Sequence, residues 1–157
     1  MSAVRSHLWF ADRAEEAVRL YTSLVPGSTM GEKHVIPTDT PSGPAGSVYT
    51  IDFTLAGQAF TALNAGPLDP FNHSFSIVVE CDDQAQIDRI WEALLDGGSP
   101  EQCGWLKDRH GVSWQIVPRG FGAMMTHPDR ARVKRAADAM LQMVKFDIAK
   151  LQAAFDG

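Results

Sequence analysis

The stretch CGWLKDRHGVSWQIVP, residues 103–118, determines how the rest of the chain is interpreted. Two apolar runs flank Asp108-Arg109-His110-Gly111, a polar tetrapeptide that ends in glycine, and this arrangement predicts a β-hairpin. Tryptophan, valine and isoleucine, which suit a half-buried pleated surface, are prominent in the arms. We expect the turn between the arms, with Lys107, Asp108 and Arg109, to be solvated.

Alternation along the second arm divides its side chains between two faces of a strand. One face carries Val112, Trp114 and Ile116, and the other carries Ser113, Gln115 and Val117. A polar Gln115 that is buried needs hydrogen-bond partners from the backbone, from water or from a ligand. Gln115 is therefore a candidate binding residue.

Composition limits the classes of function. The chain has 157 residues, 45% of them hydrophobic and 21% charged, which is typical of one compact globular domain or of two small halves that share a core. A net charge of −5 without a basic patch argues against a nucleic-acid partner. The sequence shows neither an apolar run of about 18 residues nor a secretory signal, so we expect no membrane partner.

The two cysteines, Cys81 and Cys103, have neither the spacing of a metal site nor the number that a disulfide framework needs. We interpret both as small hydrophobic residues. Two reduced thiols are compatible with a cytoplasmic location.

The first part of the chain predicts a helix within a set of strands. The strands are expected at residues 4–10, 30–36, 47–55 and 58–63, with a loop over residues 37–46. The first strand places Arg5, His7 and Trp9 on one face. The helix begins near Asp12, which with Glu15 has the pattern of a capping box.

The same order of elements then begins again, after a connector over residues 64–72. We expect a strand at residues 74–80, a helix capped by Asp82 or Asp83, and then the hairpin. Only residues 99–102 remain for the strand before the hairpin, so the second copy is abbreviated. After a loop at residues 119–122, helices are predicted from Asp129 and from Asp147.

This order predicts an α+β fold of two βαβββ modules that share a cleft, with C-terminal helices. The expected boundaries within one structural domain are 1–65, 73–120 and 128–157. The extension at 128–157 would cover a sheet edge or pack on a second subunit, and the sequence does not choose between these placements.

Three stretches resemble the PhnB-like, demethylubiquinone methyltransferase-like branch of the glyoxalase, bleomycin-resistance and vicinal-oxygen-chelate (VOC) superfamily. They are HLWFADRAEEAVRLYTSLVP, ECDDQAQIDRIWEALLDGG and CGWLKDRHGVSWQIVP, and MLQMVKFDIAKLQAAF near the C-terminus is also similar. The resemblance implies two βαβββ modules, a homodimer and a concave site lined by strands.

The metal ligands of the superfamily are not found at the corresponding positions of this chain. Placed by motif, the four ligand positions fall on Arg5, near Ala62, on Ser74 and on Gln115. None of these is an ionisable metal ligand, whereas tight binding of a transition metal normally needs three. His7 and His73 would reach ligand positions only through register shifts, which turn a strand side chain to the opposite face. We therefore predict no metal and no cofactor.

The methyltransferase name finds no support in the motifs either. The chain has no glycine-rich turn that opens a βαβ unit, and Gly120-Phe121-Gly122 lies too late to be one. The reaction, and whether the protein is an enzyme at all, stay open.

The leading hypothesis is a metal-independent homodimer that binds a small, partly apolar molecule in the cleft. Its candidate lining residues are Arg5, His7, Trp9, Ser74 and Gln115. Arg5 would pair a carboxylate or phosphate of the ligand, and His7 is the candidate general base. One alternative is a metal-dependent lyase, isomerase or dioxygenase of the glyoxalase type. Another is a non-catalytic interaction module whose cleft is filled by side chains.

Overall fold

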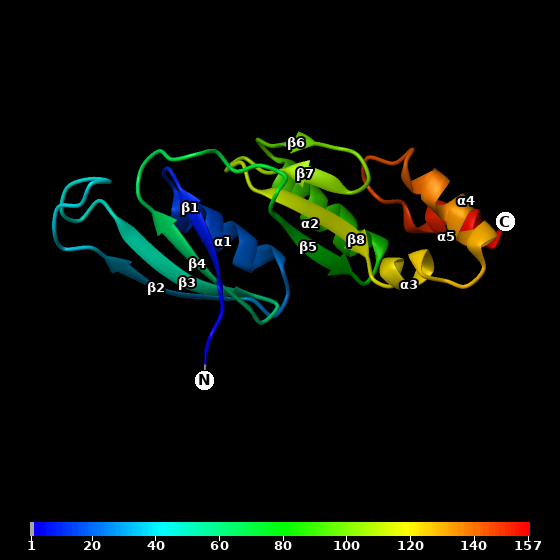
Figure 1. The fold of residues 1–157 in the computed structure, drawn as a ribbon, viewed down its shortest axis with the longest axis horizontal. Helices are drawn as coiled ribbons and strands as arrows, with labels where there is room; N and C mark the ends of the chain where they lie inside the picture. Colours follow the sequence, from blue (N-terminus) through cyan, green and yellow to red (C-terminus); the bar gives the residue numbers. More distant parts are fainter. Residues whose placement is uncertain (1) are drawn as a thin grey trace. The chain divides into compact units, whose positions relative to one another are not determined.

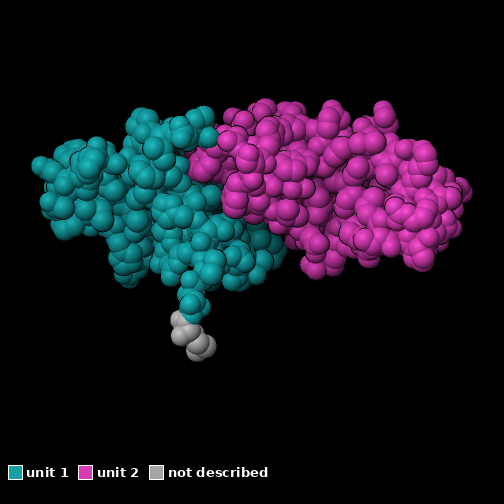
Figure 2. Space-filling view, in the orientation of Figure 1, with its two compact units in different colours: residues 1–70 teal, residues 71–157 magenta. Residues whose placement is uncertain are grey.

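The computed structural model describes residues 2–157. The chain divides into two compact units, residues 1–70 and 71–157, which Figure 2 colours separately. Each unit holds one four-stranded mixed sheet with a helix against it. The predicted α+β architecture of two βαβββ modules with C-terminal helices is therefore confirmed.

The first unit contains β1 (Ser6–Phe10), α1 (Ala14–Leu24), β2 (Thr29–Val35), β3 (Tyr49–Leu55) and β4 (Gln58–Asn64). The strand order is β1-β4-β3-β2, with β1 parallel to β4 and the other pairs antiparallel (Figure 1). Strand alternation buries Ile51 and Phe53 beneath α1, whose stripe includes Val18 and Tyr21. The opposite face of this sheet carries polar side chains such as Asp52 and Thr61 together with Trp9 and Leu63.

The start of helix α1 is held by tertiary contacts. Asn64 Oδ1 accepts a hydrogen bond from the Ala14 N–H at 3.2 Å, and the Tyr49 hydroxyl accepts one from the Glu15 N–H at 3.3 Å. The N-cap residue itself gives no side-chain hydrogen bond. The capping box predicted at Asp12 is therefore wrong, because β3 and β4 provide the acceptors that a helix start requires.

The second unit repeats the topology with β5 (Ser76–Cys81), α2 (Gln84–Leu95), β6 (Ser99–Pro100), β7 (Trp105–Lys107) and β8 (Ser113–Pro118). The strand order is β5-β8-β7-β6 (Figure 1). Helix α2 packs on this sheet and begins as predicted, since Asp83 accepts a hydrogen bond from the Gln86 N–H at 2.8 Å.

The predicted hairpin is confirmed as β7, a turn and β8, but the turn is not solvated throughout. Asp108 is only 3% exposed and accepts hydrogen bonds from the backbone N–H groups of His110 and Val112. Its other oxygen accepts the indole N–H of Trp114 at 2.9 Å. The turn prediction for Asp108 is wrong because its carboxylate closes the turn from the inside.

Three helices follow the second sheet: α3 (Phe121–Met125), α4 (Arg130–Met140) and α5 (Ile148–Asp156). Helix α3 begins within residues 119–122, where the sequence predicts a loop. Asp129 and Asp147 cap α4 and α5 as expected. Among residues 2–157, no helix is long and apolar enough to cross a membrane.

The segment between α4 and α5 attaches the extension to the second sheet. The backbone N–H groups of Cys103 and Gly104 donate to the carbonyls of Met143 and Val144 at 2.8 and 2.7 Å. Phe146 is buried, and its ring lies where a Cβ at Gly104 would stand. Of the two placements left open by the sequence, the structure shows the extension packed on its own second module.

Candidate functional site

The face of the first sheet opposite α1 carries rows of side chains that cross the strands. The register places His7 beside Thr61, and Thr61 beside Asp52. The next row places Trp9 beside Leu63. His7 is exposed and Trp9 is half-buried, as expected of an open face. The open face of the first sheet therefore holds two of the predicted cleft residues side by side in one strand.

Arg5 joins this face through a charged network. Its Nη1 lies 2.8 Å from Asp52 Oδ2 and 3.5 Å from Thr61 Oγ1, and the Thr61 hydroxyl donates to Asp52 Oδ1 at 2.5 Å. The Thr61 hydrogen bond, and then the Arg5 guanidinium, hold the pKa of Asp52 below its ordinary value. Arg5 thus already faces a carboxylate of its own unit.

The indole of Trp9 is fixed by the connector that follows β4. Its Nε1–H donates to the Gly66 carbonyl at 2.9 Å. The indole N–H is therefore satisfied within the chain, and the ring is held at the end of β1 as an apolar surface. Its contribution to a ligand site would be ring contact.

The open face of the second sheet has a different chemistry. Val78 of β5, Gln115 of β8 and Trp105 of β7 stand opposite one another in register. Gln115 Nε2 donates to Ser76 Oγ at 3.0 Å. Val78 is 53% exposed, while Trp114 on the other face is completely buried. The row combines an apolar side chain, an amide and an indole on a face that α2 does not cover.

Ser74 is not brought to Gln115. It lies in an exposed turn before β5, where its N–H donates to Asn72 Oδ1 at 2.8 Å. The strand begins two residues later than predicted, and Ser76 is the residue that contacts Gln115. The sequence did not reveal this difference, because in a strand that began at residue 74 the side chains of Ser74 and Ser76 would share one face.

Two further residues stand beside this row. His73 Nδ1 lies 3.1 Å from Glu101 Oε2, and the His73 ring centroid lies 6.1 Å from that of Trp105. Sequence reasoning did not find Glu101, which comes from the short segment between β6 and β7 and matches no motif. The pairing of β6 with β7 places Glu101 near Trp105, whose ring also lies beside that of His73.

Ser113 lies between Ser76 and Lys107 in the register of the second sheet. It is 1% exposed, and its hydroxyl has no hydrogen-bond partner among residues 2–157. An unsatisfied buried hydroxyl is costly and requires a partner such as water or a ligand. Ser113 lies on the same strand face as Gln115, but its hydroxyl is closed off from the surface and is not available to a ligand on the open face.

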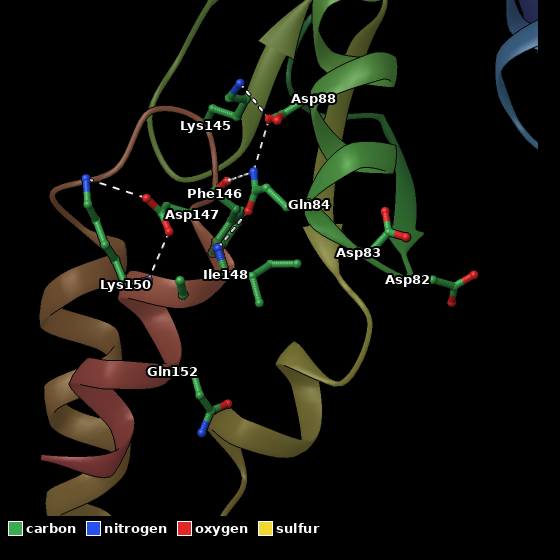
Figure 3. A pocket seen from close by; sticks show the side chains of 11 residues that line it. Asp82, Asp83, Gln84, Asp88, Lys145, Phe146, Asp147, Ile148, Lys150 and Gln152 are labelled. Carbon is green, nitrogen blue, oxygen red and sulfur yellow. Dashed lines mark hydrogen bonds and ion pairs between the residues drawn. The ribbon is translucent and has the colours of Figure 1, made fainter.

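A separate pocket of about 860 Å³ lies where α2 and α5 begin (Figure 3). Its carboxylates are already engaged in the fold. Asp88 pairs with Lys145 at 2.7 Å, and Asp147 caps α5 and contacts Lys150. Asp83 caps α2, and Asp82 pairs with Arg119. These contacts give the pocket a structural role in joining the extension to α2.

The chain is similar to a known protein family and to proteins of known structure. A family model described as 3-demethylubiquinone-9 3-methyltransferase matches residues 2–117. The chain belongs to this family. The match to the PhnB-like family includes both sheets and ends before α3, so the C-terminal helices lie outside it. Among curated proteins, none matches the chain.

Solved structures place this PhnB-like chain in the VOC superfamily. A PhnB protein from Bacillus cereus is 27% identical, with a TM-score of 0.64, and the match covers 74% of this chain and 99% of that one. Protein PA1353 from Pseudomonas aeruginosa is 22% identical, with a TM-score of 0.57 and coverages of 75% and 98%. The fosfomycin resistance protein FosX from Listeria monocytogenes, a complex with Mn(II) and sulfate, shares the fold at 11% identity, with a TM-score of 0.53 and coverages of 77% and 94%.

Proposed function

We propose that this PhnB-like protein binds a small, partly apolar molecule on the open faces of its sheets. The observation that carries the proposal is the row of Val78, Gln115 and Trp105, which presents an apolar side chain, an amide and an indole on an uncovered face. Small-molecule sites combine apolar and aromatic walls with a few convergent polar groups in this way.

A ligand on the open face of the first sheet would meet Arg5, His7 and Trp9. Of the described residues, Asp52 and Thr61 contact Arg5 only through Nη1, so its other guanidinium nitrogens remain available to a carboxylate or phosphate. The Asp52 carboxylate reduces the local positive charge, and we therefore propose a hydrogen-bonding role for Arg5 over a purely electrostatic one. His7 remains the proposed proton acceptor, and Ser74 is proposed at the rim.

The test is a small-molecule screen on protein labelled with 5-fluorotryptophan, whose four indoles give separate fluorine resonances. Substitution of each tryptophan by phenylalanine assigns them. A ligand on the open faces should shift the Trp105 and Trp9 signals, while Trp91 and Trp114, both buried, serve as internal controls. A broad panel that moves neither Trp105 nor Trp9 would contradict the proposal.

We also propose that binding needs no transition metal. Of residues 2–157, no three His, Cys, Asp or Glu side chains gather closely enough to hold a metal ion. Asp52 is engaged by Arg5 and Thr61, and Glu101 by His73, so the donor set does not fit a three-ligand site. Elemental analysis after incubation with zinc, nickel, manganese and iron(II) tests this. About one metal per chain, lost on His7→Ala, would favour a metal-dependent glyoxalase-type enzyme.

We assign no reaction to the protein. The methyl transfer in the family's name has no structural counterpart among the described residues, since Gly120 is the N-cap of the short helix α3 and opens no βαβ unit. A homodimer remains part of the proposal, and light scattering coupled to size-exclusion chromatography tests it. A monomer at micromolar concentration would contradict this part alone.

A further inference from the structure

His73 and Glu101 form a pair at the edge of the open face of the second sheet. Their Nδ1 and Oε2 atoms lie 3.1 Å apart, and their side chains are 55% and 27% exposed. The turn that carries His73 is itself fixed, because the side chain of Asn72 accepts the Ser74 N–H. The imidazole is therefore presented to solvent from a defined position.

The pair belongs to the same patch as the row described above. The rings of His73 and Trp105 are tilted by 57° with centroids 6.1 Å apart. Trp105 stands opposite Gln115, which donates through Nε2 to Ser76. No described residue donates to the Oε1 atom of Gln115. An indole, an imidazole and an amide oxygen thus lie next to one another in one unit.

The contact of Glu101 with Nδ1 of His73 bears on which nitrogen a neutral imidazole presents to a ligand. An ionised carboxylate only accepts hydrogen bonds, so the imidazole nitrogen that faces it carries the hydrogen. In a neutral imidazole with Nδ1–H, the other nitrogen, Nε2, is an acceptor. Fixing the tautomer of a histidine through its second nitrogen is a common way to prepare the first for contact.

We propose that Glu101 positions His73 so that its Nε2 accepts a hydrogen bond from an O–H or N–H group of the ligand. The apolar part of that ligand lies against Trp105, and Gln115 Oε1 accepts a second donor. This inference rests on the proposed small-molecule function and narrows the ligand class to apolar molecules that bear hydrogen-bond donors. His73 is then a contact residue, and Glu101 a positioning residue.

The first test is the tautomer, measured by long-range ¹H–¹⁵N NMR of the imidazoles. His73 should show a protonated Nδ1 and an unprotonated Nε2. His127 is an internal control with the opposite tautomer. Its Nδ1 accepts the Asp129 N–H at 3.1 Å, so its hydrogen must be on Nε2. Glu101→Ala should give His73 a mixture of tautomers, and Glu101→Gln, whose amide oxygen still accepts, should restore the wild-type pattern. A wild-type His73 protonated at Nε2 alone would overturn the inference.

The second test compares phenol with anisole, two probes of similar ring size of which only phenol donates a hydrogen bond. Titrations followed at the Trp105 indole should show phenol binding about threefold to tenfold tighter than anisole, the value of one hydrogen bond. His73→Ala should abolish this preference and Glu101→Ala should reduce it. His34→Ala, an exposed histidine of the first sheet, should leave it unchanged.

Two outcomes separate this inference from the function on which it rests. The inference would be overturned, with small-molecule binding left intact, if phenol and anisole bound with equal affinity. The same would follow if neither of them shifted the Trp105 resonance while other compounds did. A screen in which no compound at all shifts Trp105 or Trp9 would overturn both.

Discussion

The two sheets of this protein share one strand order but differ in size and in the chemistry of their open faces. In the first sheet, β2, β3 and β4 have seven residues each, whereas β6 has two and β7 has three. The first open face carries the ionised network of Arg5 and Asp52, and the second carries the neutral contact of Gln115 with Ser76. The same topology therefore supports two different kinds of polar surface.

The difference in size shows how a reduced module keeps its core. In the second unit, the backbone of Cys103 and Gly104 bonds to residues 143–144, and Phe146 fills the adjacent space. The C-terminal extension, which the family match does not include, supplies these contacts. We infer that short strands are tolerated here because a later segment of the chain satisfies their backbone groups and covers their apolar side chains.

The largest expected effect is on stability, through the packing of Phe146 within the second unit. Phe146→Ala should lower the free energy of unfolding by about 3–5 kcal/mol, because a fully buried aromatic ring leaves a cavity. Leu141→Ala, in an exposed side chain of the same extension, is the matched control and should cost no more than about 0.5 kcal/mol. Chemical denaturation measures both. Equal effects would show that the second sheet does not depend on the extension.

The next effect concerns the turn between β7 and β8, which the buried carboxylate of Asp108 closes. Asp108→Ala should cost about 2–3 kcal/mol, because the indole N–H of Trp114 and the Val112 N–H lose their acceptors in a buried place. In Trp114→Phe protein the same substitution should cost less, which a double-mutant cycle measures. Asp69→Ala, at an exposed site of the first unit, is the control. A cycle with no coupling would show that the indole contact is not part of the cost.

The N-termini of α1 and α2 differ in how they are capped: residues of the strands cap α1, whereas the neighbouring Asp83 caps α2. Asn64→Ala in the first unit and Asp83→Ala in the second should each cost about 1 kcal/mol, because each removes one acceptor at a helix N-terminus. In isolated peptides, circular dichroism should detect the loss of the Asp83 cap in the α2 sequence. The α1 peptide lacks Asn64 and should be poorly helical. An α1 peptide as helical as that of α2 would contradict this distinction.

The smallest effect is the pH response of the first open face. Because the pKa of Asp52 is lowered in the folded protein, its ionised form contributes stability above the ordinary carboxyl pKa, and this contribution is lost as the pH falls through the lowered value. Thr61→Val should raise the pKa of Asp52 toward its ordinary value, which a ¹³C NMR titration of the carboxylate measures. The exposed Asp39 carboxylate is the control. An unchanged Asp52 titration would show that the Thr61 hydroxyl does not set it.

Local signals in the sequence predicted much of the fold. Asp83, Asp129 and Asp147 accept hydrogen bonds from N–H groups two or three residues later, so their caps were visible in the sequence. Alternation in the second arm of the hairpin correctly placed Gln115 and Trp114 on opposite faces, since strand geometry alone determines this. The predictions for Asp12 and Asp108 were wrong because partners from folded elements replaced the expected local or solvent contacts.

In the candidate site, too, some features follow from local sequence signals and others from tertiary contacts. The sequence by itself determined the order of elements, the two-module fold and the face on which His7, Trp9 and Gln115 lie, because these depend on periodicity and on contacts between near neighbours. The tertiary structure decided that Asp52 holds Arg5, that Ser76 meets Gln115 and that Glu101 faces His73. Each of these pairs joins residues from different strands or loops, so only the folded chain brings them within hydrogen-bonding distance.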